Sequence, residues 1–167
     1  MVWTILVLIP KGTTNTRCIG LLEIPWKVVE VLIDTRLCAS LQMHKVLHGF
    51  RSRRGMGTAI MELNISQELS IIDKDPLFLV FLDLRKAYDT VHWDRLLITL
   101  EGYGEGPRMC GILEIFWDYQ QVVPIQNGFH GLAFPYKRGT TNGGLFPLTM
   151  FNVVVDNFIR TWLAMAV

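Results

Sequence analysis

Six consecutive apolar residues, Leu77–Leu82 (LFLVFL), constrain the fold of this chain more than any other segment. They follow a break at 73–76 (DKDP) and lead directly into Asp83. A short apolar run bounded by turn residues is typical of a strand that is buried on both faces of a sheet. We therefore expect a central strand at 77–82 that ends at a carboxylate.

Helical and extended patterns are interspersed around this segment, without a regular alternation. Residues 3–9 predict a buried strand followed by a loop through Arg17, and Asn127-Gly128 predicts a hairpin. Apolar residues spaced by three and four predict helices at 26–41, 58–72, 93–101 and 108–120, and from Pro147 onward. These patterns together predict an α+β fold, in which the last helix partly buries Phe151, Val155, Phe158 and Trp162.

Composition restricts the class of protein. A chain of 167 residues that is 50% apolar and 19% charged has the size and apolar content of one folded domain, not of a disordered tail. The net charge of +1 predicts neither strong nucleic-acid binding nor its absence, so a basic surface has to be local. Three scattered cysteines without a CxxC pair favour neither zinc nor a disulfide framework, and fit a reducing intracellular setting. We expect no membrane span and no secretion signal.

Two segments carry residues that could take part in binding or catalysis. Asp83 stands at the end of the apolar run, where a carboxylate is costly unless it is paired, solvated or bound to a metal. Its alternative role is that of a helix cap or loop anchor. Residues 48–57 form the only local basic cluster, in which Arg51, Arg53 and Arg54 flank the aromatic Phe50. Such a cluster can follow a nucleic-acid backbone and stack a base, or it can be a solvated loop.

Four blocks of this sequence resemble the reverse transcriptases of non-LTR (LINE-like) retroelements, in the order of that family. VFLDLRKAYDTVHWDRLL around Asp83 is similar to the first catalytic motif. The segments LIPKG at 8–12 and RCIGLLEIPWKVV at 17–29 resemble the fingers motifs, and LHGFRSRRGMGTA at 47–59 resembles the next fingers block. RGTTNGGLFPLTMFNVVVDNFIR at 138–160 resembles the motif in which a glycine turn leads into a long helix.

The resemblance implies an incomplete polymerase palm with part of the fingers. Residues of about 1–75 would be fingers-like and residues of about 76–167 a partial palm. In that family, metal ions held by carboxylates assist templated nucleotidyl transfer, and hard oxygen ligands favour Mg²⁺. Asp83 corresponds to the first metal-binding aspartate, with the backbone carbonyl of Leu84 as a further ligand. The implied partners are an RNA or DNA template-primer and a deoxynucleoside triphosphate.

The resemblance also assigns roles in binding. Arg17 corresponds to an arginine that contacts the triphosphate, and Lys11 is a weaker candidate of the same kind. Tyr88 corresponds to an aromatic residue that excludes a ribose 2′-OH, and Asn142-Gly143 stands where the family has glutamine-glycine. The implied template contacts are Phe50, Arg51, Arg53 and Arg54.

The sequence departs from the family at one decisive point. The next catalytic motif of the family contains two adjacent aspartates, and no two aspartates are adjacent in this sequence. One carboxylate does not supply the ligands of two Mg²⁺ ions. We therefore expect a reverse transcriptase fragment, truncated before that motif and inactive alone. The alternative is a non-catalytic remnant that binds nucleotide or nucleic acid.

Overall fold

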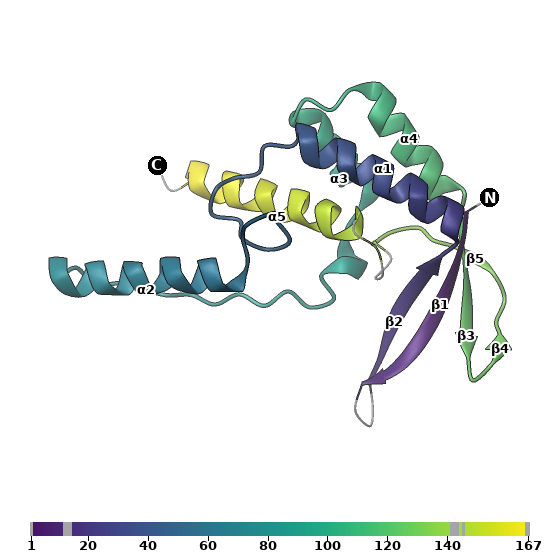
Figure 1. Ribbon diagram of the computed structural model, residues 1–167, viewed down its shortest axis with the longest axis horizontal. Helices are drawn as coiled ribbons and strands as arrows, with labels where there is room; N and C mark the ends of the chain where they lie inside the picture. Colours follow the sequence, from purple (N-terminus) through teal and green to yellow (C-terminus); the bar gives the residue numbers. More distant parts are fainter. Residues whose placement is uncertain (1, 12–14, 141–143, 145, 166–167) are drawn as a thin grey trace.

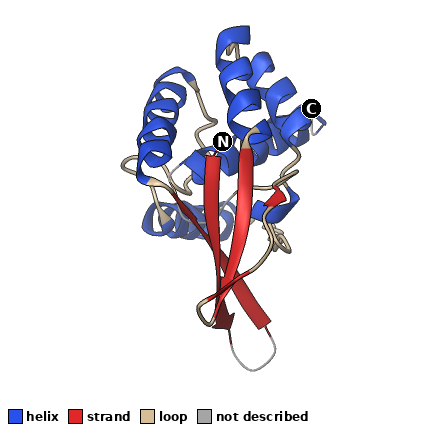
Figure 2. Ribbon diagram, turned by 90° about the vertical axis from the view of Figure 1, so that its right-hand side faces the viewer, coloured by secondary structure: helices blue, strands red, loops and turns tan. Residues whose placement is uncertain are grey.

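The computed structural model describes residues 2–11, 15–140, 144 and 146–165, and Figure 1 shows their arrangement. The sheet is mixed. Strand β1 (Val2–Lys11) pairs antiparallel with β2 (Asn15–Leu22) on one side and parallel with β3 (Gln120–Gln126) on the other. The short strands β4 (Phe129–His130) and β5 (Phe134–Pro135) both pair antiparallel with β3. In Figure 2 the β1–β2 hairpin projects away from the helices.

Four helices enclose the core at one end of the sheet. They are α1 (Ile24–Ser40), α3 (Trp93–Gly102), α4 (Pro107–Asp118) and α5 (Phe146–Met165). Each contributes side chains that are almost fully buried, including Leu37, Leu100, Leu113 and Met150. The core therefore joins α1, from the first part of the chain, to α3, α4 and α5.

Helix α2 (Met56–Asp73) extends away from this core (Figure 1). None of its residues is buried. Its first turn is stabilised by Thr58, whose Oγ1 accepts a hydrogen bond from the Gly55 N–H at 3.0 Å and donates one to the Gly55 carbonyl at 2.8 Å. The predicted helix is confirmed, but its apolar stripe lies in solvent.

The predicted central strand at 77–82 is wrong. The segment is not part of any strand, and its six side chains are between 42% and 86% exposed. The physical reason is pairing. Strand β1 has β2 on one side and β3 on the other, so β1 takes the central position in the sheet that was predicted for Leu77–Leu82. In Figure 1 this segment runs back alongside α2.

The remaining elements follow the predictions with local differences. Strand β2 begins at Asn15, so residues 15–17 belong to a hairpin and not to the expected loop. The Asn127-Gly128 hairpin is confirmed, with φ of 52° and 80° at its two central residues. No helix in the described part of the chain is long and apolar enough to cross a membrane.

Phe151 and Val155 of α5 are partly buried, as predicted, whereas the other two residues predicted to be partly buried are mostly exposed. Phe158 and Trp162 are each 55% exposed, whereas Met150, Val153 and Asp156 are fully buried. The first half of α5 packs on the core, as the burial of Met150 and Val153 shows, and its second half extends past the core, where neighbours are fewer. An apolar pocket of about 320 Å³ lies along this second half, and it is lined by Val80, Leu82, Phe158, Thr161, Trp162 and Met165.

Candidate functional site

Two loops that are far apart in sequence are hydrogen-bonded to each other between the sheet and α5. The 3-10 helix η1 (Tyr88–Thr90) follows the Asp83 segment, and residues 139–140 precede α5. The Gly139 N–H donates to the Val91 carbonyl at 2.7 Å, and the Thr140 N–H donates to the Tyr88 carbonyl at 3.0 Å. The indole N–H of Trp93 donates to the Gly139 carbonyl at 2.7 Å. These bonds hold the stretch that follows Asp83 against the beginning of the segment 138–160.

Gly139 is required at this junction for two reasons. Its φ of +84° lies in the region that disfavours residues with a Cβ. A Cβ at this position would also lie 3.0 Å from the Asp89 Cα and 3.0 Å from the Tyr88 carbonyl oxygen. The backbone of η1 therefore packs directly against the backbone of Gly139.

Tyr88 is half-buried at the junction. Its ring lies 5.0 Å from the ring of Phe151 on α5, measured between centroids. The ring of Tyr136 lies 6.1 Å from the ring of Trp93, measured between centroids. Burial, followed by the charges of Asp89 and Cys18, raises the pKa of Tyr136 to about 12.

A buried acid lies under the start of α5. Glu30 of α1 is 5% exposed, and a Cβ at Gly144 would lie only 2.3 Å and 2.5 Å from its two carboxylate oxygens. Burial, strengthened by the neighbouring charge of Asp34 and opposed by Lys27, raises the pKa of Glu30 to about 7. Sequence analysis did not identify Glu30, although its position four residues after Trp26 and three before Ile33 places it on the apolar face of the predicted helix.

The predicted metal ligands do not form a cluster in this structure. Asp83 and Leu84 lie on an exposed stretch between the apolar segment and η1. Among the described residues, no three histidine, cysteine, aspartate or glutamate side chains gather in a group that could hold a metal ion. The residues present therefore do not fit a complete two-metal site.

Asp156 does not supply the missing carboxylate either. It is fully buried in α5 and accepts hydrogen bonds from the Tyr103 hydroxyl at 2.5 Å, from Arg160 Nε at 2.7 Å and from the His44 N–H. Burial raises the pKa of this carboxyl, but the bonds from Arg160, Tyr103 and His44 outweigh that effect and lower it below its ordinary value. Both of its oxygens accept hydrogen bonds from donors inside the protein, which assigns it a structural role.

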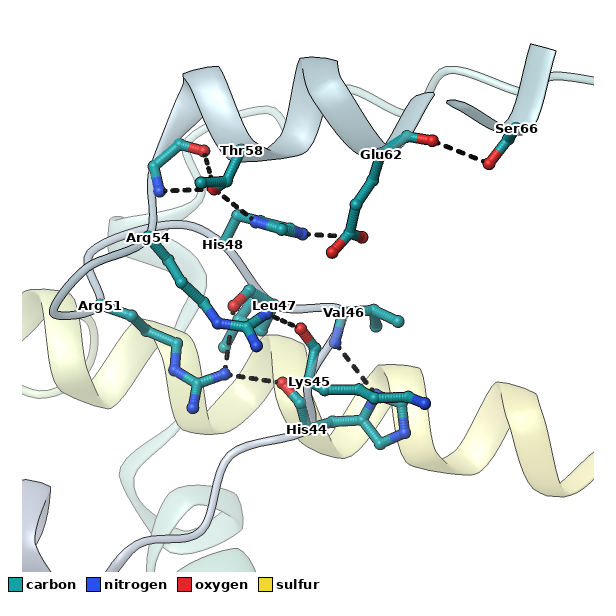
Figure 3. Close-up of polar contacts among 11 residues, drawn as sticks. His44, Lys45, Val46, Leu47, His48, Arg51, Arg54, Thr58, Glu62 and Ser66 are labelled. Carbon is teal, nitrogen blue, oxygen red and sulfur yellow. Dashed lines mark hydrogen bonds and ion pairs between the residues drawn. The ribbon is translucent and has the colours of Figure 1, made fainter. Parts of the chain in front are cut away.

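The four predicted residues of the basic loop fall into two groups, and Figure 3 shows the contacts of Arg51 and Arg54. Arg51 Nη1 donates to the carbonyls of His44 and Leu47 at 2.8 Å and 3.2 Å, and Arg54 Nη1 donates to the Lys45 carbonyl. These two arginines therefore fasten the loop. Phe50 and Arg53 are exposed, with positive φ of 50° and 60°. The side chain of Asn152 on α5 donates to the Gly49 carbonyl at 2.9 Å and anchors the loop from below.

The other predicted residues lie at the ends of the β1–β2 hairpin and before α5. The backbone of Lys11 pairs with that of Asn15, and the backbone of Arg17 pairs with that of Ile9. Asn142 and Gly143 lie outside the described residues. Their neighbours in sequence, Thr140 and Gly144, contact η1 and α1 respectively.

Comparison with known proteins agrees with this arrangement of motifs. A "Transposon TX1 uncharacterized 149 kDa protein" from Xenopus laevis is 26% identical over 164 residues, which are 93% of this chain and 12% of that protein's length. Residues 9–166 match the family described as reverse transcriptase (RNA-dependent DNA polymerase). This match begins within β1 and ends beyond α5, so it includes both loops of the junction and every helix of the core. The chain therefore belongs to the reverse transcriptase family.

Proposed function

We propose that this chain supplies the fingers-like part, about 1–75, and a partial palm, about 76–167, of a retroelement reverse transcriptase. The observation that carries the proposal is the junction of η1 with residues 139–140. It brings the end of the Asp83 segment beside the segment that contains Asn142 and Gly143. Two motifs that serve one nucleotide in the family are thus neighbours in space.

The proposed nucleotide contacts follow from the chemistry of the residues that the family resemblance assigns. Arg17 and Lys11 carry the positive charge that a triphosphate requires, and an arginine can bind two phosphate oxygens at once. Tyr88, held by Phe151, would limit the space beside the sugar. Asn142 and Gly143 are proposed to contact the nucleotide because they stand where the family has glutamine-glycine.

Template-primer contact is proposed for the basic loop. Phe50 and Arg53 are exposed there, as stacking on a base and binding of a phosphate require. Arg51 and Arg54 would contribute mainly by holding the loop in shape, since their Nη1 atoms donate to backbone carbonyls. Replacing Arg53 should therefore weaken nucleic-acid binding with little loss of stability.

The chain alone is proposed to be inactive as a polymerase. Mg²⁺, when bound, stabilises the charge that develops on the transferred phosphate. Asp83 and the Leu84 carbonyl would hold such an ion, but they provide too few ligands for two ions. The test is extension of a labelled primer on RNA and DNA templates with Mg²⁺ or Mn²⁺, by the unchanged chain and by Asp83→Asn. Templated extension by the unchanged chain that the substitution abolishes would refute the proposed inactivity.

A second candidate function is nucleotide binding without catalysis. It is favoured by the lack of a metal-ligand cluster among the described residues. Phosphate contacts do not need a second metal ion, so binding of a deoxynucleoside triphosphate should persist. Equilibrium dialysis should then show that Arg17→Ala weakens binding more than Asp83→Asn does. The reverse order would contradict both the role of Arg17 and this candidate function.

A further inference from the structure

The segment Leu77–Leu82 has no backbone partner in this structure. It follows a course without helical turns alongside α2 (Figure 1), and each of its six side chains is at least 42% exposed. Among the described residues, no backbone hydrogen bond joins this segment to another part of the chain. Unpaired N–H and C=O groups on an exposed apolar stretch are a template for pairing with another strand.

The accessible surface of the chain leaves room for a partner. Its area is 12094 Å², whereas a folded monomer of 19.1 kDa typically exposes about 8,400 Å². The excess of about 3,700 Å² is larger than the roughly 1,000–2,500 Å² that each subunit of an obligate dimer buries. Exposed apolar side chains account for part of this surface, and those of Leu77–Leu82 adjoin Phe158 and Trp162 on α5.

Two residues with left-handed backbones limit the segment. Lys74 has a φ of 58° and Lys86 has a φ of 53°, and no residue between them has a positive φ. The stretch 75–85 between these limits has Val80 as its midpoint. The chain turns away at both lysines, so a strand paired with this stretch would end before it reached them.

We propose that residues 77–83 pair antiparallel with the same residues of a second copy of this chain, with Val80 opposite its counterpart on a twofold axis. This inference is independent of the proposed nucleotide contacts. Pro76 fits the pairing only where its backbone faces away from the partner, because proline has no N–H. Bonded and non-bonded positions alternate along an antiparallel ladder, so Val80, four residues on, is non-bonded as well. The N–H groups that face the second copy are then those of Leu77, Leu79, Phe81 and Asp83.

Charge selects this register. With the axis at Val80, Asp75 of each copy lies opposite Arg85 of the other, and both side chains are exposed. An axis at Leu79 would instead place Asp75 opposite Asp83, so that like charges would meet at both ends of the ladder. The sequence around the apolar run is therefore complementary to itself in one antiparallel register.

Helix α5 supports the paired strands from one face. Val80 and Leu82 line the apolar pocket together with Phe158 and Trp162 of α5, so the side of the segment that carries them faces this helix. Opposite residues of an antiparallel pair project to the same face, so the second copy adds its own apolar side chains there. A ribbon of two strands is marginally stable by itself and needs such a helix.

The first test is disulfide formation across the twofold axis. Residues that lie opposite each other at a non-bonded position have Cα atoms about 4.5 Å apart, which a disulfide can span. Val80→Cys should therefore give a disulfide-linked dimer on mild oxidation. Phe78→Cys is the matched control, since residue 78 is also exposed but would lie about 13 Å from its counterpart, and it should give none. Equal linkage in both variants, or none in Val80→Cys, would overturn the proposal.

The second test is the mass in solution by sedimentation equilibrium. The unchanged chain should sediment as a dimer, with twice the mass of 19.1 kDa. Arg85→Asp should raise the dissociation constant about tenfold, because like charges then meet at two places, and adding Asp75→Arg should restore it. Arg108→Asp, at an exposed position on α4, should leave it unchanged. A monomer, a polydisperse aggregate, or a double variant that is no tighter than Arg85→Asp would contradict the pairing.

Discussion

Asp156→Asn tests how much one buried carboxylate contributes to the packing of three segments against one another. The two Asp156 oxygens receive donors from the segment that follows α1 (His44), from the end of α3 (Tyr103) and from α5 itself (Arg160). Asparagine has the same shape and can still accept the His44 N–H through its oxygen. Its amide nitrogen, however, would face Tyr103 and Arg160, which are both donors to Oδ2 in this structure.

The magnitude follows from these two bonds. A hydrogen bond to a charged group contributes about 1.5–3 kcal/mol, so the loss of both would cost about 3–6 kcal/mol. Arg160 is 44% exposed and can turn toward water, which reduces the loss to about 3 kcal/mol. This is a large part of the about 5–15 kcal/mol by which a typical domain is stable.

The assay is urea unfolding at about pH 7 followed by circular dichroism, with Asp118→Asn at an exposed position as the control. The urea concentration at the midpoint of unfolding should be lower for Asp156→Asn than for the unchanged chain, while the dependence of the unfolding free energy on urea stays the same. The pKa of Asp156 is lowered in the folded chain, so its contribution is present above 3.8 and is lost as the pH falls through the folded value. The difference between the variants should therefore shrink in acid. A loss at neutral pH no larger than that of Asp118→Asn would refute this account of the bonds.

Three further substitutions test other contacts. The pKa of Glu30 rises from 4.5 to about 7 on folding, so its contribution to the free energy of unfolding is complete below pH 4.5 and is lost as the pH rises through about 7. The unchanged chain should lose about 3 kcal/mol of unfolding free energy over this range, and Glu30→Gln should not. Gly139→Ala should cost about 2 kcal/mol more in urea unfolding than Gly104→Ala, which has a similar φ of +91° but no atom within 4 Å; equal losses would contradict the backbone contact with η1. Leu113→Ala should lower thermal stability by about 2–5 kcal/mol, and Leu132→Ala, at 90% exposure, by less than about 0.5 kcal/mol.

Local patterns predicted the helices and the hairpins, but they did not predict the pairing of the strands. The periodicity of α1, α3, α4 and α5 and the Asn127-Gly128 turn depend on residues close in sequence, which is why their positions were correct within a few residues. The apolar run at 77–82 indicates only that a strand would be stable if a partner were available. Its pairing depends on which strands β1 accepts, and β1 pairs with β2 and β3.

The residues proposed for the candidate site come from the family resemblance, whereas their contacts come from the fold. Family resemblance assigned a role to Tyr88, and the structure adds the contact of its ring with Phe151 and the hydrogen bond from the Thr140 N–H to its carbonyl. The role of Arg51 and Arg54 in fastening their own loop depends on the fold of residues 44–54, which charge alone does not indicate. Glu30 was missed because a single acid in an apolar stripe does not by itself indicate a function. Its contact with Gly144, which is remote in sequence, becomes visible only in the fold.

The exposed segment Leu77–Leu82 has a consequence for copies of this chain at high concentration. Identical apolar hexapeptides in register can stack into cross-β ribbons, in which successive strands lie about 4.8 Å apart. At each end of this segment the sequence opposes such stacking. Asp75 and Asp83 would form ladders of like charge at that spacing, and Pro76 removes a backbone donor at the start of every strand. The charge of Asp83, at the end of the apolar segment, would thus oppose polymerisation of that segment.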